Sequence, residues 1–142
     1  MALESRKPLA AIELELVRAF VSAAHADLDK VKELLDKEPG LLHASMNWGG
    51  GDWETGLGAA AHVGRRDIAE YLVARGARLD IFAAAMLGHL ELVKSIIEQY
   101  PDMVHAEGPH GIPLIRHAAM GGLRAQVVFQ FLEQAIGGEE IK

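Results

Sequence analysis

Apolar residues recur at three- and four-residue steps in four stretches of the chain, and each stretch predicts a pair of helices. The predicted pairs cover residues 8–40, 55–76, 80–100 and 112–136. In the first pair, a helix from Pro8 to His25 is predicted, because Pro suits the first helical position. Its expected apolar face consists of Leu9, Ile12, Leu16, Phe20 and Ala23 or Ala24. Residues 137–142 are predicted to form a flexible tail.

Breaks in this pattern indicate where the helices begin and end. Asp27 is a candidate cap for the second helix, and Pro39-Gly40 stops it. Gly64 and Gly88 occupy equivalent places between paired helices, where a left-handed backbone is needed. Residues 41–55 include three consecutive glycines, which disfavour a helix, so this stretch is predicted to be a long loop.

The chain repeats itself. Residues 28–44 lie over residues 90–106 without a gap, so that Val31 matches Val93 and His43 matches His105 at the same offset of 62 residues. The two middle pairs repeat at an offset of 24 residues. Internal repeats of this length predict stacked units, each of which buries its apolar face against a neighbour.

Residues 55–77 resemble an ankyrin repeat, from the opening Thr55 to the closing Gly76-Ala77. Ala84-Ala85, Gly88-His89 and Val93 repeat elements of the same pattern, although Gly56 and Gly58 replace the proline and histidine of its usual opening. The resemblance implies a single all-α domain over residues 1–142. That domain would be an ankyrin-like solenoid of about four antiparallel helix pairs, with irregular connecting loops and little or no β-strand. It also implies protein binding through the loop edge and the concave face of the inner helices.

Composition narrows the function classes. The chain is 50% hydrophobic but only 6% aromatic, which predicts an aliphatic, alanine-rich core. A net charge of −6 argues against nucleic-acid binding, and the lack of cysteine excludes disulfides and thiolate metal sites. No leader peptide and no apolar run of about 20 residues is evident, so we expect a soluble, cytoplasmic protein without membrane partners.

The loop edge supplies the candidate binding surface. Both tryptophans of the chain lie in the glycine-rich stretch, and tryptophan is favoured at binding hot spots. The alternative is that at least one of them folds back to seal the loop. Asp52 and Glu54 are interpreted as solvated carboxylates or as caps of the helix that begins near Gly56. The Thr55 hydroxyl is a further candidate for that cap. The predicted partner-binding residues are Trp48, Asp52, Trp53, Glu54, His62, Met86 and His110.

Metal binding and catalysis have weaker support. His43 and His105 are equivalent positions two units apart, on the order of 20 Å, and so cannot share an ion. No His-x-x-x-His pair occurs, so no metal or cofactor is expected, although a site with His105, His110 or His117 stays open. Nucleophile and phosphate-loop motifs are absent from the sequence, so no catalytic residue is predicted.

Two functions therefore remain open. The first is a non-catalytic interaction module for a protein or peptide, with self-association through the terminal units as a further option. The second is a small-ligand or metal-binding protein, with or without catalysis, built on the glycine–tryptophan loop.

Overall fold

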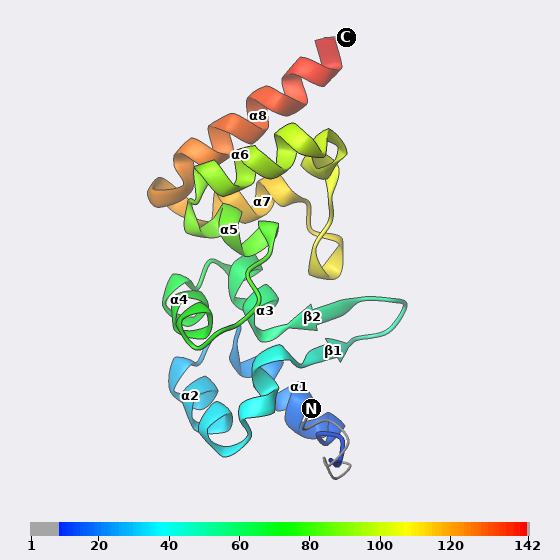
Figure 1. Ribbon diagram of the computed structural model, residues 1–142, viewed down its shortest axis with the longest axis vertical. Helices are drawn as coiled ribbons and strands as arrows, with labels where there is room; N and C mark the ends of the chain where they lie inside the picture. The colour runs from blue at the N-terminus through cyan, green and yellow to red at the C-terminus, as the bar shows by residue number, and fades with distance from the viewer. Residues whose placement is uncertain (1–8, 142) are drawn as a thin grey trace, which may run out of the picture.

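The computed structural model describes residues 9–141, with side chains described as far as residue 138. Within that range, eight α-helices and one antiparallel two-stranded sheet make up most of the fold (Figure 1). The helices are α1 (Leu14–Ala23), α2 (Leu28–Lys37), α3 (Gly56–Val63), α4 (Arg66–Ala74), α5 (Ile81–Leu87), α6 (Leu90–Gln99), α7 (Leu114–Met120) and α8 (Gln126–Ile141). The strands are β1 (Ser45–Asn47) and β2 (Trp53–Thr55), and the 3-10 helices are η2 (Pro39–His43), η3 (Pro101–His105), η4 (Pro109–Gly111) and η5 (Gly122–Ala125).

The helices pack as successive pairs along the long axis of the molecule (Figure 1). Helices α1, α3, α5 and α7 contact one another in that order, and each also contacts the helix that follows it in the chain. This arrangement confirms the prediction of a mostly helical fold with very little strand.

Side-chain caps and glycine turns define the helix boundaries. Asp27, Thr55 and Asp80 each accept a hydrogen bond from a backbone amide in the first turn of the helix that they precede. Gly64 and Gly88 have φ angles of 77° and 84°, as predicted for left-handed turns between paired helices. At Gly88 a Cβ atom would lie 2.2 Å from the Arg124 carbonyl oxygen, so this close approach also excludes any larger residue.

Alanines form the contact between the inner helices. Three alanines of α3, at positions 59–61, and three of α5, at positions 83–85, are completely buried. Small side chains let these helix backbones approach closely, while the paired outer helices contribute bulkier residues such as Leu72 and Leu132.

Enlarging one of these alanines should therefore destabilise the protein. Ala84→Leu is expected to lower the free energy of unfolding by about 1–3 kcal/mol, because the buried site has no room for three more carbons. Chemical denaturation measures the change, with Ala74→Leu on the exposed end of α4 as the matched control. Equal stability of the two variants would contradict the close inner-helix packing.

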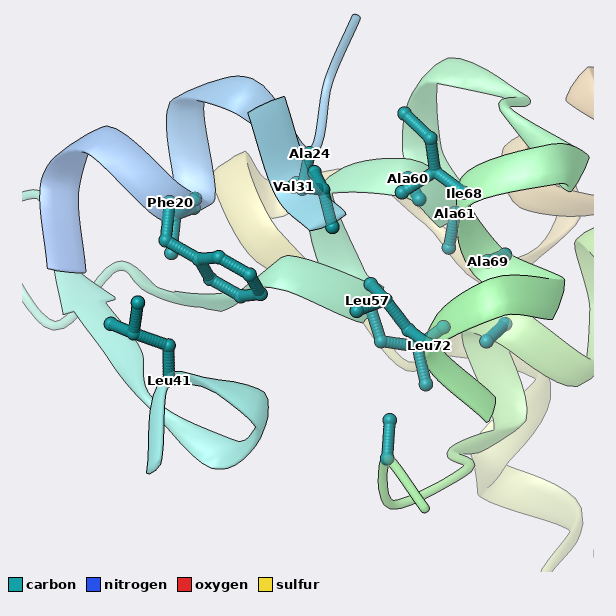
Figure 2. Close-up of a cluster of buried hydrophobic side chains, with 14 of the residues drawn as sticks. Phe20, Ala24, Val31, Leu41, Leu57, Ala60, Ala61, Ile68, Ala69 and Leu72 are labelled. Carbon is teal, nitrogen blue, oxygen red and sulfur yellow. The ribbon is translucent and has the colours of Figure 1, made fainter. Parts of the chain in front are cut away.

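Phe20 joins the first helix to the rest of the core (Figure 2). Its side chain is completely buried, together with Leu41 and Leu57. The ring lies over the first residue of α3, since a Cβ atom on Gly56 would be only 2.6 Å from Phe20 Cε2. This contact fixes the start of α3 and, with it, the end of β2.

Three predictions about the chain course need correction. The first helix begins at Leu14, because Leu9 is 91% exposed and gains nothing from helical packing; Pro8 lies outside the described residues. Residues 41–55 are not simply a loop, since they include most of η2 and the β1–β2 hairpin. Residues 137–141, predicted to be a flexible tail, instead continue α8 to Ile141, because Glu139 and Glu140 favour helix. Lys142 lies outside the described range.

None of the helices within residues 9–141 combines the length and the apolar character needed to cross a lipid bilayer.

Candidate metal centre

Three histidines and one glutamate from four separate elements meet at one point. His25 follows the end of α1, Glu54 is the middle residue of β2, His62 lies in the last turn of α3, and His110 is the central residue of η4. One nitrogen or oxygen from each side chain lies within 4.8 Å of the others. Glu54 and His62 lie on the consecutive elements β2 and α3, whereas His25 and His110 come from distant parts of the chain, so the fold brings the four side chains together.

One carboxylate oxygen lies close to all three imidazoles. Oε2 of Glu54 lies 2.9 Å from the Nε2 atom of His62 and 3.3 Å from the Nε2 atoms of both His25 and His110. The Nε2 atoms of His25 and His62 are themselves 3.1 Å apart. The His62 ring stands edge-on to the other two imidazoles, with interplanar angles of 72° to His25 and 84° to His110.

Glu54 is buried, and its two oxygens have different surroundings. Only 1% of the Glu54 surface is exposed to solvent. The Trp48 indole N–H donates a hydrogen bond of 2.9 Å to Oε1, which fixes the carboxylate plane. Oε2 is buried as well, and the three imidazole Nε2 atoms at 2.9–3.3 Å are its polar neighbours. A buried carboxylate is costly unless partners compensate its charge, and either protonated imidazoles or a bound cation can do so here.

Contacts on the outer side of two imidazoles orient them. The Nδ1 atom of His25 lies 2.9 Å from the Val21 carbonyl oxygen, and a carbonyl only accepts, so Nδ1 carries the proton. Nδ1 of His110 likewise donates to Asp52 Oδ2 over 2.7 Å. In the neutral rings, Nε2 of His25 and of His110 therefore presents a lone pair to the centre of the cluster.

His110 is held in an unusual backbone conformation. Its φ angle of 63° is the only positive value at a non-glycine position within the described residues. Asp52 stabilises this conformation, because its Oδ1 accepts a 2.8 Å hydrogen bond from the His110 backbone amide. Asp52 thus holds both the backbone and the ring of His110 against the hairpin.

The charges of the cluster favour an anionic carboxylate. Burial by itself would raise the pKa of Glu54, but its contacts with the His25 and His62 imidazoles outweigh burial and lower that pKa well below its ordinary value. The contact with Glu54 raises the pKa of His25 above 6.5. The hydrogen bond from the His110 backbone amide lowers the pKa of Asp52.

The donor set fits a tetrahedral divalent ion. Zinc binds imidazole nitrogen and carboxylate oxygen at about 2.0–2.2 Å, which places neighbouring tetrahedral ligand atoms about 3.3 Å apart. Four of the six separations among these atoms are 2.9–3.3 Å, close to that spacing, and all six are within 4.8 Å. The outer contacts from Trp48, Val21 and Asp52 supply the second layer of hydrogen bonds that metal ligands usually have.

In the metal-free protein, the pair between His25 and Glu54 should make stability depend on pH. The folded-state pKa of His25 is raised, so its stabilising effect is complete below about pH 6.5 and is lost as pH rises through the folded-state value. The stability difference between the wild type and His25→Gln should therefore shrink from pH 5.5 to about pH 8. Urea denaturation in the presence of EDTA measures this stability difference at each pH. A difference that grows with pH would contradict the raised pKa of His25. The lowered pKa of His117 acts in the opposite direction but is common to both proteins.

The structure gathers most, but not all, of the predicted binding residues. Glu54, His62 and His110 form the cluster itself, and Trp48 and Asp52 surround it. Trp53 is 58% exposed and is not a member of the cluster, whereas the Trp48 indole donates a hydrogen bond to Glu54. Met86, which was also expected on the binding surface, is completely buried and cannot line one. The interpretation of Glu54 as a solvated carboxylate is wrong, and the helix cap is Thr55.

His25 is the member that sequence reasoning missed. It has a signal in the sequence, since Ala-Ala-His occurs at residues 23–25 and again at 60–62, each time at the end of an inner helix. Neighbouring units that carry the same residue at the same place can bring two imidazoles together. His117, one of the alternatives left open, is buried elsewhere, with its Nδ1 donating to the Pro113 carbonyl oxygen.

No known family model matches this chain, and no curated protein matches it either.

Proposed function

We propose that this protein binds one divalent transition-metal ion of the zinc class through His25, Glu54, His62 and His110. The observation that carries the proposal is Oε2 of Glu54, a buried anionic oxygen faced by three imidazole Nε2 atoms at 2.9–3.3 Å. A cation at their centre would compensate the carboxylate charge and use the imidazole lone pairs.

The ligand count supports a structural or regulatory role and not a catalytic one. Catalytic zinc sites usually keep a position open for water or substrate, whereas four protein ligands fill a tetrahedral shell. The four ligands also come from the first two helix pairs, the hairpin between them and the loop that precedes α7, so the ion would tie these segments together. We therefore propose a protein without chemistry of its own.

The proposed scaffold is an ankyrin-like solenoid. Paired helices joined by left-handed glycines, inner helices in mutual contact and alanine-rich contacts support this proposal. The short connection at residues 78–80 would be a departure from a regular repeat array, because a β-turn or hairpin usually precedes each helix pair. The hairpin that precedes α3 supplies Glu54 to the proposed metal site.

Cobalt titration tests the metal proposal. Co²⁺ bound in a four-coordinate nitrogen–oxygen site absorbs visible light much more strongly than hydrated Co²⁺, so the metal-free protein should develop a saturable band at one equivalent. His62→Gln should abolish that band, and His89→Gln, at an exposed histidine outside the cluster, should preserve it. A band that survives His62→Gln, or a wild type that gives none, would refute the proposal.

Protein binding is a second candidate function, supported by a specific feature of the surface. Trp53 is 58% exposed and lines an open groove of about 770 Å³ between the β1–β2 hairpin and the loop of η4. An exposed indole beside a groove is typical of a partner contact. The metal centre and this groove share His110, so the two functions are compatible.

A further inference from the structure

The groove beside the metal cluster has two walls from distant parts of the chain. One wall is the tip of the hairpin, residues 50–53, and the other is the segment 107–111, which includes η4. Thr55, Gly58 and Phe82 line the space between them. Its volume of about 770 Å³ is within the range of ligand-binding clefts.

The charge of the groove selects a cationic occupant. Three carboxylates line it, from Asp52, Asp80 and Glu107, and no Lys or Arg of the described residues does so. Asp52 is engaged by His110, and Oδ1 of Asp80 caps α5, which leaves the Glu107 carboxylate and the second oxygen of Asp80 to face an incoming cation. The exposed Trp53 and the partly buried Phe82 add aromatic surfaces, which attract ammonium and guanidinium groups and pack against their apolar stems.

The groove also offers backbone groups to an extended chain. A Cβ atom added at Gly50, Gly51 or Gly111 would meet nothing within 4 Å, so the main chain at these positions is open on that side. Accessible amides and carbonyls can hydrogen-bond to the backbone of a bound peptide. This feature favours a peptide segment over a compact amine.

His110 connects the groove to the metal centre. It lies in one groove wall, it contacts Asp52 in the other wall, and its Nε2 points to Glu54 Oε2. A metal ion bound by His110 would fix the spacing of the two walls before a ligand arrives. Pre-organised sites bind more tightly because less ordering is needed on binding.

We infer that the groove docks a Lys- or Arg-bearing peptide segment of a partner protein, and that the metal ion strengthens this docking by fixing His110. This inference rests on the proposed metal-binding function. Asp80 and Glu107 recognise the cationic side chains, Trp53 covers their stems, and the metal centre sets the width of the groove.

Fluorescence anisotropy with a fluorescein-labelled octapeptide of alternating lysine and glycine tests the inference on the full chain. We expect the zinc-loaded wild type to bind this peptide, and the Asp80→Asn/Glu107→Gln double variant to bind it on the order of tenfold more weakly. Asn at position 80 keeps the cap of α5, so folding should be preserved. The matched control is Asp29→Asn/Glu91→Gln, which removes two exposed charges outside the groove and should bind as the wild type does.

Three outcomes would overturn the inference. Equal weakening in the two double variants would show that the net negative charge alone attracts the peptide. Competition by spermidine at the same concentration as the unlabelled peptide would identify a small polyamine as the ligand. Equal peptide affinity with and without zinc would remove the metal dependence.

Calorimetry on the same samples separates this inference from the metal proposal. If zinc binds to the wild type but not to His62→Gln, the metal proposal stands whatever the peptide does. If zinc does not bind to the wild type, both fail, and any remaining peptide binding belongs to the groove alone.

Discussion

Zinc added to the metal-free protein should raise its thermal unfolding midpoint by on the order of 10 °C. An ion present at about 1,000 times its dissociation constant stabilises the folded state by about 4.1 kcal/mol, if the unfolded chain does not bind it. For a chain of 142 residues, each kcal/mol corresponds to about 3–4 °C. Differential scanning calorimetry in EDTA and then in excess zinc measures the shift.

The cluster must be the source of that stabilisation. His62→Gln should remove most of the shift, since its Nε2 atom lies closest to Glu54 Oε2 at 2.9 Å. His43→Gln changes an exposed histidine outside the cluster, so this variant should keep the zinc-induced shift in its unfolding midpoint. A shift of the same size in the wild type and His62→Gln would mean that zinc binds elsewhere.

Phe20→Ala should be among the most destabilising single substitutions. Removal of a completely buried phenylalanine is expected to lower the free energy of unfolding by about 3–5 kcal/mol. The substitution should also disturb the position of Glu54 in the metal centre, because the Phe20 ring packs against Gly56, two residues after Glu54. We therefore expect a lower cobalt affinity in those Phe20→Ala molecules that remain folded.

Urea denaturation of the metal-free protein gives the size of this effect. Leu14→Ala, at a side chain of the same helix that is 59% exposed, is the control and should change stability by less than about 0.5 kcal/mol. A loss below about 1 kcal/mol for Phe20→Ala would contradict the role of this ring as the link between α1 and α3.

Helix positions were predictable because short-range physics decides them. The middle units carry apolar steps, Thr55 and Asp80 caps and left-handed glycines at Gly64 and Gly88, and the structure has helices where these signals place them. The ends of the chain were less predictable. Leu9 continues the apolar pattern but has no partner to pack against, so the periodicity overestimates the first helix.

The metal cluster depends on contacts that no local pattern encodes. His25 and His62 are brought together by the packing of neighbouring units, and His110 reaches them from a loop two units further on. The distance argument about His43 and His105 considers equivalent positions only, and so it does not apply to a loop residue. Spacing rules for metal ligands on one helix cannot detect such a site, although the repeated Ala-Ala-His at 23–25 and 60–62 was a usable signal.

The most direct test of the metal centre is the X-ray absorption fine structure of the zinc-loaded protein at one equivalent. The geometry predicts four nitrogen and oxygen ligands at about 2.0–2.2 Å, with the outer scattering of three imidazole rings. A six-coordinate ion surrounded mainly by water, or a spectrum with fewer than two imidazoles, would contradict the account.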